Sequence, residues 1–154
     1  MEIKSISERI ESSREIARWY HDEWGELFSP ATASDFERDI KEKASLNVPV
    51  PHLYIAMESS ELVGVVELKF RENVNHPDYV HWLGGLYVRS ENRGRGVAAQ
   101  LVEFVIRQYT VLGVEEVYLQ CEEGLVGMYE NLGFSRLHPA RHGRLSTTVM
   151  VWNL

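Results

Sequence analysis

The stretch that decides the fold of this chain is Leu86-Tyr87-Val88-Arg89-Ser90-Glu91-Asn92-Arg93-Gly94-Arg95-Gly96-Val97-Ala98-Ala99. A short β-prone run leads through a turn into a loop rich in arginine and glycine, and a helix with apolar periodicity follows at once. Gly94 and Gly96 let the backbone approach a bulky anion, because no Cβ intervenes. The free N–H groups of the helix start, aided by the helix dipole, favour a phosphate there. Arg93 and Arg95 add positive charge, so the stretch predicts a pyrophosphate-binding loop.

Three kinds of phosphate-binding loop have to be distinguished. A Walker A loop needs lysine followed by serine or threonine after its last glycine, and Val97-Ala98 stand there instead. A Rossmann fingerprint fits the spacing Gly94-x-Gly96-x-x-Ala99, and Glu122 supplies an acidic residue near the end of the next strand. The 154-residue chain has only 55 residues after Ala99, however, too few for the rest of a dinucleotide-binding domain. The third pattern is Arg93-x-x-Gly96-x-Ala98.

This third pattern resembles the GNAT superfamily of acyl-coenzyme A-dependent N-acetyltransferases, in which Gln/Arg-x-x-Gly-x-Gly/Ala binds the pyrophosphate of coenzyme A (CoA). Further along, the segment Met128-Tyr129-Glu130-Asn131-Leu132-Gly133-Phe134 is similar to the family's Tyr-x-x-x-Gly-Phe segment. Together the motifs cover roughly residues 82–134, and the order of expected elements extends the resemblance over nearly the whole chain. One position departs from the pattern. Glu122 stands where many members carry an asparagine, and a carboxylate cannot donate a hydrogen bond as an amide does.

The resemblance implies where the cosubstrate acetyl-CoA would bind. Its pantetheine arm would pair with the strand Leu86-Tyr87-Val88, as an added strand does, and a backbone N–H near Leu86 would face the oxyanion. In the family this strand separates from its parallel neighbour, and Gly84-Gly85 just before it would ease such a distortion. The residues expected around the pyrophosphate are Arg93, Gly94, Arg95, Gly96, Val97 and Ala98.

Composition limits the remaining possibilities. The length fits a single domain over residues 1–154, and the net charge of −7 argues against nucleic acid as a partner. An acidic surface favours cationic acceptors such as amines. The single cysteine, Cys121, excludes an intramolecular disulfide, and no apolar run is long enough for a signal core or a membrane span. We therefore expect a cytoplasmic protein that does not associate with membranes, either a monomer or a homodimer.

The chain predicts a mixed α/β fold of the GNAT type. Its centre would be a twisted, mostly antiparallel sheet with flanking helices and a βαβ crossover at the cofactor motif. We expect Ser7 to cap a first helix, with Ile10 and Ala17 on its apolar face, and Ser34 with Glu37 to form a capping box for a second. The expected strands are 3–6, 53–57, 62–70, 79–88, 114–120, 134–137 and 145–152. The expected helices are 7–24, 34–46, 124–131 and one that starts at residue 97. The apolar face of this last helix would consist of Val97, Leu101, Phe104 and Val105.

Acyl transfer from a thioester to an amine needs a proton donor for the thiolate and an acceptor for the amine proton. Tyr129 is the candidate general acid, because a phenol is protonated at neutral pH. Two residues are candidate bases. Glu67 interrupts an apolar strand, where burial would raise its pKa, although a salt bridge with Lys69 or an arginine explains it equally well. His81 lies on the strand that leads to the acetyl site. A chain of waters is a third route for the proton.

Other residues carry weaker signals. His138 and His142 are four apart, but Pro139 between them excludes a helical metal pair and no third ligand is evident, so we expect no metal. Several aromatic side chains would either fill the core or line an acceptor pocket: Trp19, Tyr20, Trp24, Phe28 and Trp82. Nothing in the sequence identifies the amine acceptor, which would be a small molecule, a peptide N-terminus or a lysine.

The sequence thus predicts an N-acetyltransferase that moves the acetyl group of acetyl-CoA to a primary amine by direct attack in a ternary complex. A non-catalytic module that senses acyl-CoA remains the main alternative. It would keep the loop from Arg93 to Ala98 without a working acid, and Tyr129 argues against it. A Rossmann-like dinucleotide binder is the weakest alternative.

Overall fold

The computed structural model describes residues 1–27 and 31–153. In chain order the elements are β1 (Glu2–Ser5), η1 (Ile6–Ser12), α1 (Ser13–Trp24), η2 (Gly25–Leu27), α2 (Ala33–Ser45), β2 (His52–Glu58), β3 (Glu61–Phe70), β4 (His81–Val88), η3 (Ser90–Asn92), α3 (Val97–Val111), β5 (Glu116–Cys121), η4 (Glu123–Leu125), α4 (Val126–Asn131), β6 (Ser135–His142) and β7 (Leu145–Asn153). The predicted strands and helices are all present, with boundaries displaced by a few residues.

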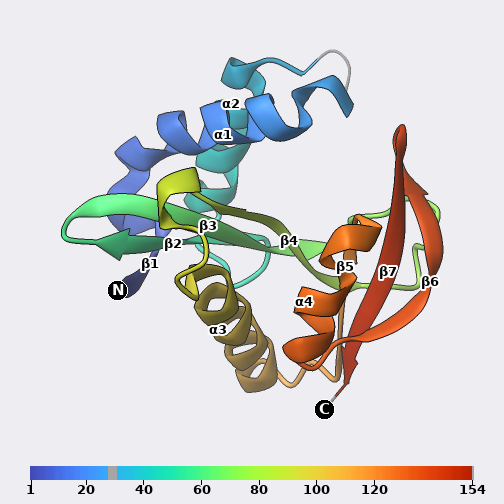
Figure 1. Cartoon of the computed structure of the whole chain (residues 1–154). Helices are drawn as coiled ribbons and strands as arrows, with labels where there is room; N and C mark the ends of the chain where they lie inside the picture. Colours follow the sequence, from blue (N-terminus) through green and yellow to red (C-terminus); the bar gives the residue numbers. More distant parts are fainter. Residues whose placement is uncertain (28–30, 154) are drawn as a thin grey trace.

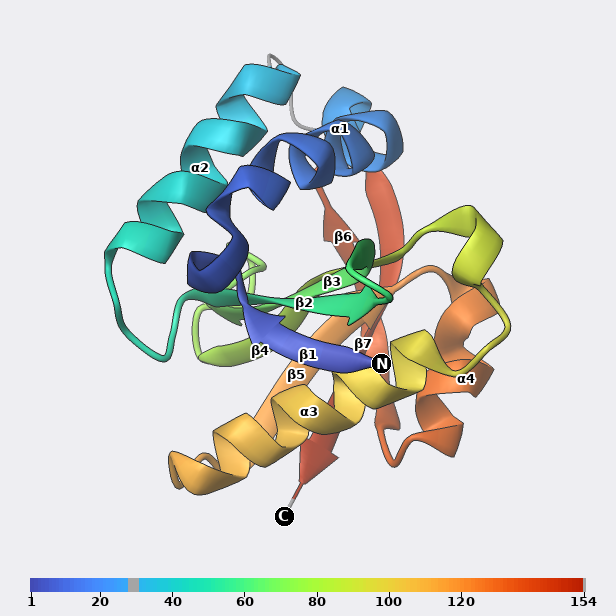
Figure 2. The ribbon, with the colours of Figure 1, turned by 90° about the vertical axis from the view of Figure 1, so that its left-hand side faces the viewer.

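The strands of the described residues form one sheet in the order β1-β2-β3-β4-β5-β7-β6. Every neighbouring pair is antiparallel except β4 and β5, which are parallel and connected through α3. Helices α1 and α2 cover one face of the sheet, and α3 and α4 lie on the other (Figures 1 and 2). The predicted mixed α/β fold, with its crossover at the arginine- and glycine-rich loop, is confirmed.

The first helical segment is divided where the sequence predicted a single helix. A 3-10 segment, η1, precedes α1, and η1 is itself kinked at Arg9, whose φ of −143° lies outside the helical range. Ser5 is the N-cap of η1: its side chain accepts a hydrogen bond from the Ser7 N–H, and the Glu8 side chain accepts one from the Ser5 N–H. The predicted cap at Ser7 is therefore wrong, because the Ser-x-x-Glu capping pattern begins at Ser5. As a result Ile10, expected on the buried face, is 40% exposed.

The second helix, α2, also begins earlier than predicted. Thr32 is its N-cap and accepts a hydrogen bond from the Asp35 N–H at 3.2 Å, while the Asp35 carboxylate accepts one from the Thr32 N–H at 2.8 Å. The predicted box of Ser34 and Glu37 is wrong, because a better pair of capping residues stands two positions earlier. Glu37 instead pairs with Lys41 at 2.9 Å, one helical turn later.

Two apolar layers hold the helices on the sheet. Under α3 the predicted stripe is buried at Val97, Leu101 and Val105, and the half-buried Phe104 packs on the ring of Tyr54 with centroids 4.7 Å apart. Under α1 and α2 the buried side chains include Ile16, Ala17, Tyr20, Ile40, Leu53, Ile55 and Val65. Because β3 is covered on both faces, a carboxylate within it must find partners inside the protein.

Candidate active site

The parallel strands β4 and β5 separate in the middle of the sheet. They are joined by one bridge, Trp82 with Tyr118, and beyond it β4 continues to Val88 without pairing to β5. The register between β3 and β4 shifts by one residue between Val65 and Glu67, so β4 carries a bulge there. Gly85 lies at this bulge with a φ of +56°, a conformation that favours glycine. The strand edge beyond Trp82 therefore has backbone groups available to an extended ligand, as the resemblance implies.

The arginine- and glycine-rich loop after this strand presents backbone donors to an open space. Gly96 is the N-cap of α3 with a φ of +81°, no side chain caps the helix, and its first turn contains no acidic residue. A Cβ placed on Gly94 or Gly96 would meet no protein atom within 4 Å. The start of α3 thus combines unpaired N–H groups with the positive end of the helix dipole, an arrangement suited to a phosphate.

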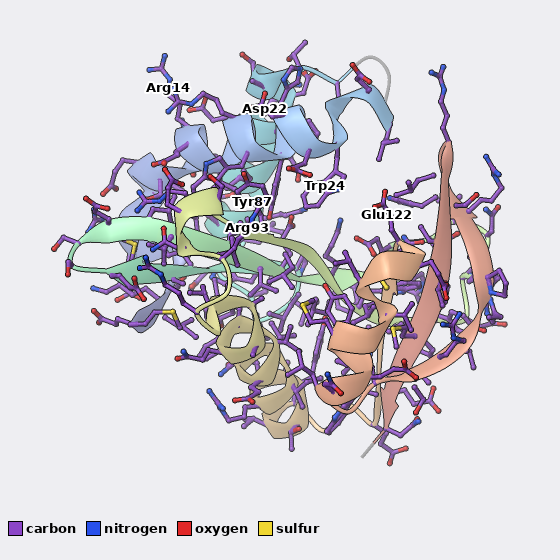
Figure 3. The ribbon with its side chains drawn as sticks, viewed as in Figure 1. Arg14, Asp22, Trp24, Tyr87, Arg93 and Glu122 are labelled. Atoms are coloured by element: carbon purple, nitrogen blue, oxygen red, sulfur yellow. The ribbon has the colours of Figure 1, made fainter. Side chains whose placement is uncertain are left out.

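The two arginines of the loop differ in how they are held. The Arg93 Nε donates a hydrogen bond to the Val88 carbonyl at 2.9 Å, and its guanidinium carbon lies 5.2 Å from the centroid of the Tyr87 ring. Tyr87 in turn stacks on Trp19 of α1, with centroids 4.9 Å apart. Figure 3 shows Tyr87 and Arg93 side by side below α1. Both arginines are exposed, but the Arg95 side chain forms no such contact with a described residue.

A polar cluster fixes the loop to the β2–β3 hairpin. The Arg89 guanidinium donates to the buried Asn92 side chain at 2.9 Å and to Glu61 at 3.0 Å, and the Asn92 amide donates to Glu58 at 3.4 Å. These contacts fix the position of η3 relative to the β2–β3 hairpin. The segment that leads into Gly94 and Gly96 is therefore anchored to the sheet.

Tyr129 lies on α4, on the same side of the sheet as α3. Its side chain is buried against Phe134, with ring centroids 6.1 Å apart, and no described residue forms a hydrogen bond with its hydroxyl. Burial, with the nearby Cys121 and Glu72, raises the pKa of Tyr129 well above its usual range. The phenol is therefore a proton donor at neutral pH whose hydroxyl has no partner within the described chain.

Glu67 is buried and paired. Its Oε1 accepts a hydrogen bond from the Lys43 Nζ of α2 at 2.8 Å, and the Tyr20 hydroxyl of α1 lies beside the carboxylate and donates to the Gly85 carbonyl at 2.8 Å. Burial raises the pKa of Glu67, but the charges of Lys43 and Lys69 more than offset it, and the pKa is lowered overall. The expected rise in its pKa is therefore wrong. Glu67 does form a salt bridge, but its partner is Lys43 of α2 rather than Lys69 or an arginine, and Lys69 pairs with Glu72.

His81 lies at the beginning of β4, before the bridge to β5. Its ring contacts Phe70 and Tyr109, with centroid distances of 5.4 and 5.5 Å. Tyr109 belongs to the last turn of α3, at the opposite end of that helix from the glycine loop. Burial and the charge of Arg71 lower the pKa of His81. The loop, the bulge and Glu67 thus lie along the part of β4 that is not paired with β5, Tyr129 lies on α4 after β5, and His81 lies on the paired side of the split.

The GNAT acetyltransferase family model matches residues 14–134. The chain belongs to the GNAT family. Enzymes of this family use acetyl-CoA, so the chain is an acetyltransferase by family. No curated protein sequence matches it significantly.

Solved GNAT structures share the fold over its full length at low sequence identity. A ribosomal-protein-alanine N-acetyltransferase from Brucella melitensis superposes with a TM-score of 0.79 at 18% identity, with 100% of both chains covered. An aminoglycoside 6'-N-acetyltransferase complexed with coenzyme A gives 0.76 at 15% identity, covering 99% of this chain and 97% of that one. A variant of a spermidine N-acetyltransferase from Vibrio cholerae gives 0.73 at 15% identity, with 99% and 95% covered.

Several residues at the GNAT split were not singled out by sequence patterns. Lys43, which pairs with Glu67, lies in the last turn of α2, and Glu72 follows β3 in a loop. Gln120 lies near the end of β5 and donates a hydrogen bond to Glu72 at 3.3 Å. Local sequence gives no signal for these pairs, because their members are distant in the chain and meet only when the sheet is formed.

The remaining predicted side chains fall into distinct environments. Trp82 is fully buried beside Tyr118, so it belongs to the core, whereas Trp24 is partly buried at the end of α1, and Figure 3 shows it on the same side of the molecule as Glu122. Phe28 lies outside the described residues. Burial and Glu123 raise the pKa of Cys121 to about 11, which keeps its thiol protonated.

The histidine pair of β6 does not act as one unit. His138 shares a hydrogen bond of 2.8 Å between its Nε2 and the Tyr79 hydroxyl, and it contacts His76 rather than His142, with ring centroids 4.8 Å apart. Within residues 1–27 and 31–153, no group of three or more histidine, cysteine, aspartate or glutamate side chains is arranged to hold a metal ion. None of the helices in these residues is long and apolar enough to cross a membrane.

Proposed function

We propose that this GNAT protein transfers the acetyl group of acetyl-CoA to a primary amine by direct attack in a ternary complex. The observation that carries the proposal is the split between β4 and β5. It exposes an unpaired strand edge with the donor-rich start of α3 at one end, and Tyr129 is carried by α4, which follows β5 on the other side of the split. No metal is needed for this reaction.

The glycine loop fits the phosphates of acetyl-CoA. The space beyond Gly94 and Gly96 is open, and the N–H groups of Val97 and Ala98 at the helix start are without a capping side chain. We assign the pyrophosphate to these backbone groups and to Arg93, Gly94, Arg95, Gly96, Val97 and Ala98. The pantetheine arm is assigned to the free edge of Leu86, Tyr87 and Val88 by strand-like pairing.

Tyr129 is assigned as the general acid. Its raised pKa keeps the phenol protonated at neutral pH, so the hydroxyl can donate a hydrogen bond, and then its proton, to the sulfur as negative charge develops there. Neither of the two predicted bases is used in this proposal. Glu67 is occupied by Lys43 and Tyr20, and His81 lies beyond the bridge that joins β4 to β5.

The acceptor is proposed to be a cationic amine. The chain has a net charge of −7, and the carboxylates of Glu67 and Glu72 lie against the two glycines of the β4 bulge. The three structural neighbours described above are named for amine acceptors: a protein alanine, spermidine and an aminoglycoside. These names agree with an amine substrate and leave its identity open.

A panel of amines tests this function by following free thiol release from acetyl-CoA. The panel includes polyamines, aminoglycosides and peptides with free N-termini, and mass spectrometry identifies the acetylated product. Thermal melts with CoA and with NAD accompany it. Binding of CoA should stabilise the fold by about 2.7 kcal/mol at a hundredfold excess over the dissociation constant. Stabilisation by CoA without transfer to any amine would favour the sensing module, and stabilisation by NAD alone would contradict both.

A further inference from the structure

Glu72, in the loop after β3, folds back over the sheet toward the split. Its Oε1 accepts a hydrogen bond from the Lys69 Nζ at 3.2 Å, and its Oε2 accepts one from the Gln120 Nε2 of β5 at 3.3 Å. The side chain is 11% exposed. One carboxylate therefore connects the end of β3 with β5 and reaches across β4, whose pairing with β5 ends nearby.

The backbone of β4 passes directly against this carboxylate. A Cβ on Gly84 would collide with the Glu72 Oε1 and with the Lys69 side chain, just as a Cβ on Gly85 would collide with Glu67 and Tyr20. The two glycines of the bulge thus allow two carboxylates to approach the same stretch of strand. The proposed function, on which this inference rests, places the reacting acetyl group beside that stretch.

The two carboxylates are held differently. Glu67 is bound by Lys43 at 2.8 Å from beneath α2 and is 5% exposed, so its charge is neutralised within the protein. Glu72 has a neutral amide on one oxygen and a longer ion pair on the other, and more of its side chain is exposed. Each carboxylate oxygen can accept more than one hydrogen bond, so Glu72 has acceptor capacity left for a substrate.

A second layer of polar side chains orients Glu72. The Gln120 Oε1 accepts hydrogen bonds from the Asn73 Nδ2 at 3.0 Å and from the Thr147 hydroxyl at 3.3 Å. Both contacts fix the amide so that its Nε2 faces Glu72. Asn73 is itself buried and also donates to the Arg141 carbonyl at 2.9 Å. The position of Glu72 is therefore set by β5, β6 and β7, the strands on the far side of the split.

We infer that Glu72 is the general base that accepts the proton of the attacking amine. It pairs with Lys69 and Gln120, whose side chains lie on the sheet face that α1 and α2 cover, whereas Tyr129 lies on the face of α3 and α4. The charge of Glu72 is nevertheless close enough to contribute to the raised pKa of Tyr129. A proton acceptor and a proton donor thus lie on opposite sides of the opening between β4 and β5.

The reaction balances with these two groups. A cationic acceptor first loses one proton to solvent. The lone pair this leaves on nitrogen forms a bond to the thioester carbonyl carbon, and the bond from that carbon to sulfur breaks. The proton lost by nitrogen goes to the Glu72 carboxylate, directly or through one water, and the thiolate takes the proton of Tyr129. The products are the acetylated amine and free CoA. Glu72 then returns its proton to solvent and Tyr129 regains one.

Glu72→Gln tests this assignment, because it keeps the shape of the side chain and removes the proton acceptor. We expect kcat to fall by ~10²-fold or more, with CoA affinity unchanged. The pH dependence of kcat/KM is measured with a weakly basic primary amine, so that protonation of the amine does not mask the enzyme's own acidic limb. The wild type should lose activity on the acid side of this profile because the reaction needs a free carboxylate, and the variant should lack that limb. The matched control is Glu103→Gln, an exposed position on α3.

A second variant guards against a folding defect. Glu72→Asp keeps the charge that pairs with Lys69 but withdraws the carboxylate, and we expect it to fold, to bind CoA and to lose turnover by ~10–10²-fold. If the wild type acetylates an amine while both variants keep its turnover and acidic limb, this assignment is overturned and the proposed function stands. If the wild type binds CoA but acetylates no amine, the proposed function falls and this assignment falls with it.

Discussion

The two sides of the split between β4 and β5 are built in opposite ways. On the side of the glycine loop, the donors are backbone N–H groups, and the residues that place them are consecutive, from Arg93 to Ala98. On the other side, the functional groups are side chains that arrive from α1, α2, β3, the loop after β3 and β5. The glycine-loop side can bind a phosphate only if its backbone has the right conformation and the space around it is open. The side-chain side is stable only if each buried charge is paired with an opposite charge or a hydrogen-bond donor.

This difference determines which substitutions each side tolerates. The glycines of the backbone site face open space, so most nearby side chains should have little effect, whereas a negative charge in the path of the phosphates opposes binding. In a network of buried charges, removal of one partner destabilises the fold, because the remaining charge stays buried without compensation.

The largest effect is expected from Gly96→Asp on the backbone side. The substitution places a carboxylate where the pyrophosphate should lie, and juxtaposed like charges cost several kcal/mol. We expect the dissociation constant of CoA to rise by ~10³-fold, equivalent to about 4 kcal/mol, while the fold survives. Isothermal titration with CoA measures the change. Gly96→Asn is the matched control, because asparagine has the same shape, carries no charge and tolerates the positive φ. Equal losses in the two variants would show that space rather than charge excludes the cosubstrate.

The same difference explains how much of the protein the sequence could predict. The crossover and the loop follow from contiguous signals: a β-prone run, two glycines, and apolar residues at helical spacing. The split was implied by the resemblance to the GNAT family. Capping was misplaced at Ser7 and at Ser34 because overlapping Ser/Thr and acidic pairs compete over two or three residues. Glu72 and Lys43 could not be predicted because their partners lie on other elements. Contacts between residues that are distant in the chain leave no pattern in the local sequence.

The second prediction concerns the charge network. Lys43→Met leaves the carboxylate of Glu67 buried without its nearest cation, and breaking a buried pair in this way destabilises a protein strongly. We expect a loss of about 3 kcal/mol in the free energy of unfolding, at the lower end for such pairs because Lys43 is partly exposed. Urea denaturation measures it. The double variant Lys43→Met with Glu67→Gln should recover most of the loss, and a double variant as unstable as the single one would show that packing at Lys43 is responsible.

The ion pair also predicts how stability depends on pH. The pKa of Glu67 is lowered in the folded protein, so its contribution is present above the unfolded pKa and is lost as pH falls through the folded value. The pKa of Lys43 is raised, so its contribution is present at neutral pH and is lost only as pH rises through its folded value. Wild-type stability should therefore fall at acid pH. The double variant should show a shallower fall, and curves of equal slope would place the titrating group elsewhere.

The third prediction addresses the acid on α4. Tyr129→Phe removes one hydroxyl that has no partner among the described residues, so stability should change little. Turnover should fall by ~10²-fold if acyl transfer limits the rate, because protonation of the thiolate is lost. CoA affinity should change much less. Tyr118→Phe, whose hydroxyl donates to Glu116, is the control. Unchanged turnover in Tyr129→Phe, with acyl transfer shown to limit the rate, would remove Tyr129 from the mechanism.

The smallest effects are expected where the backbone site uses side-chain charge. Both side chains are exposed, but Arg93 is held by the Val88 carbonyl and the Tyr87 ring, whereas Arg95 has no such contact among the described residues. A held side chain loses less conformational freedom when it binds an anion, so its charge contributes more to affinity. We expect Arg93→Gln to weaken CoA binding about fivefold and Arg95→Gln by less, in the range of an exposed ion pair. Both losses should shrink as salt is raised, because exposed charges are screened. A larger loss of affinity in Arg95→Gln would contradict this order. It would mean that the Arg95 side chain takes the position next to the phosphates when the cosubstrate binds, so that the backbone side of the split also depends on side-chain rearrangement.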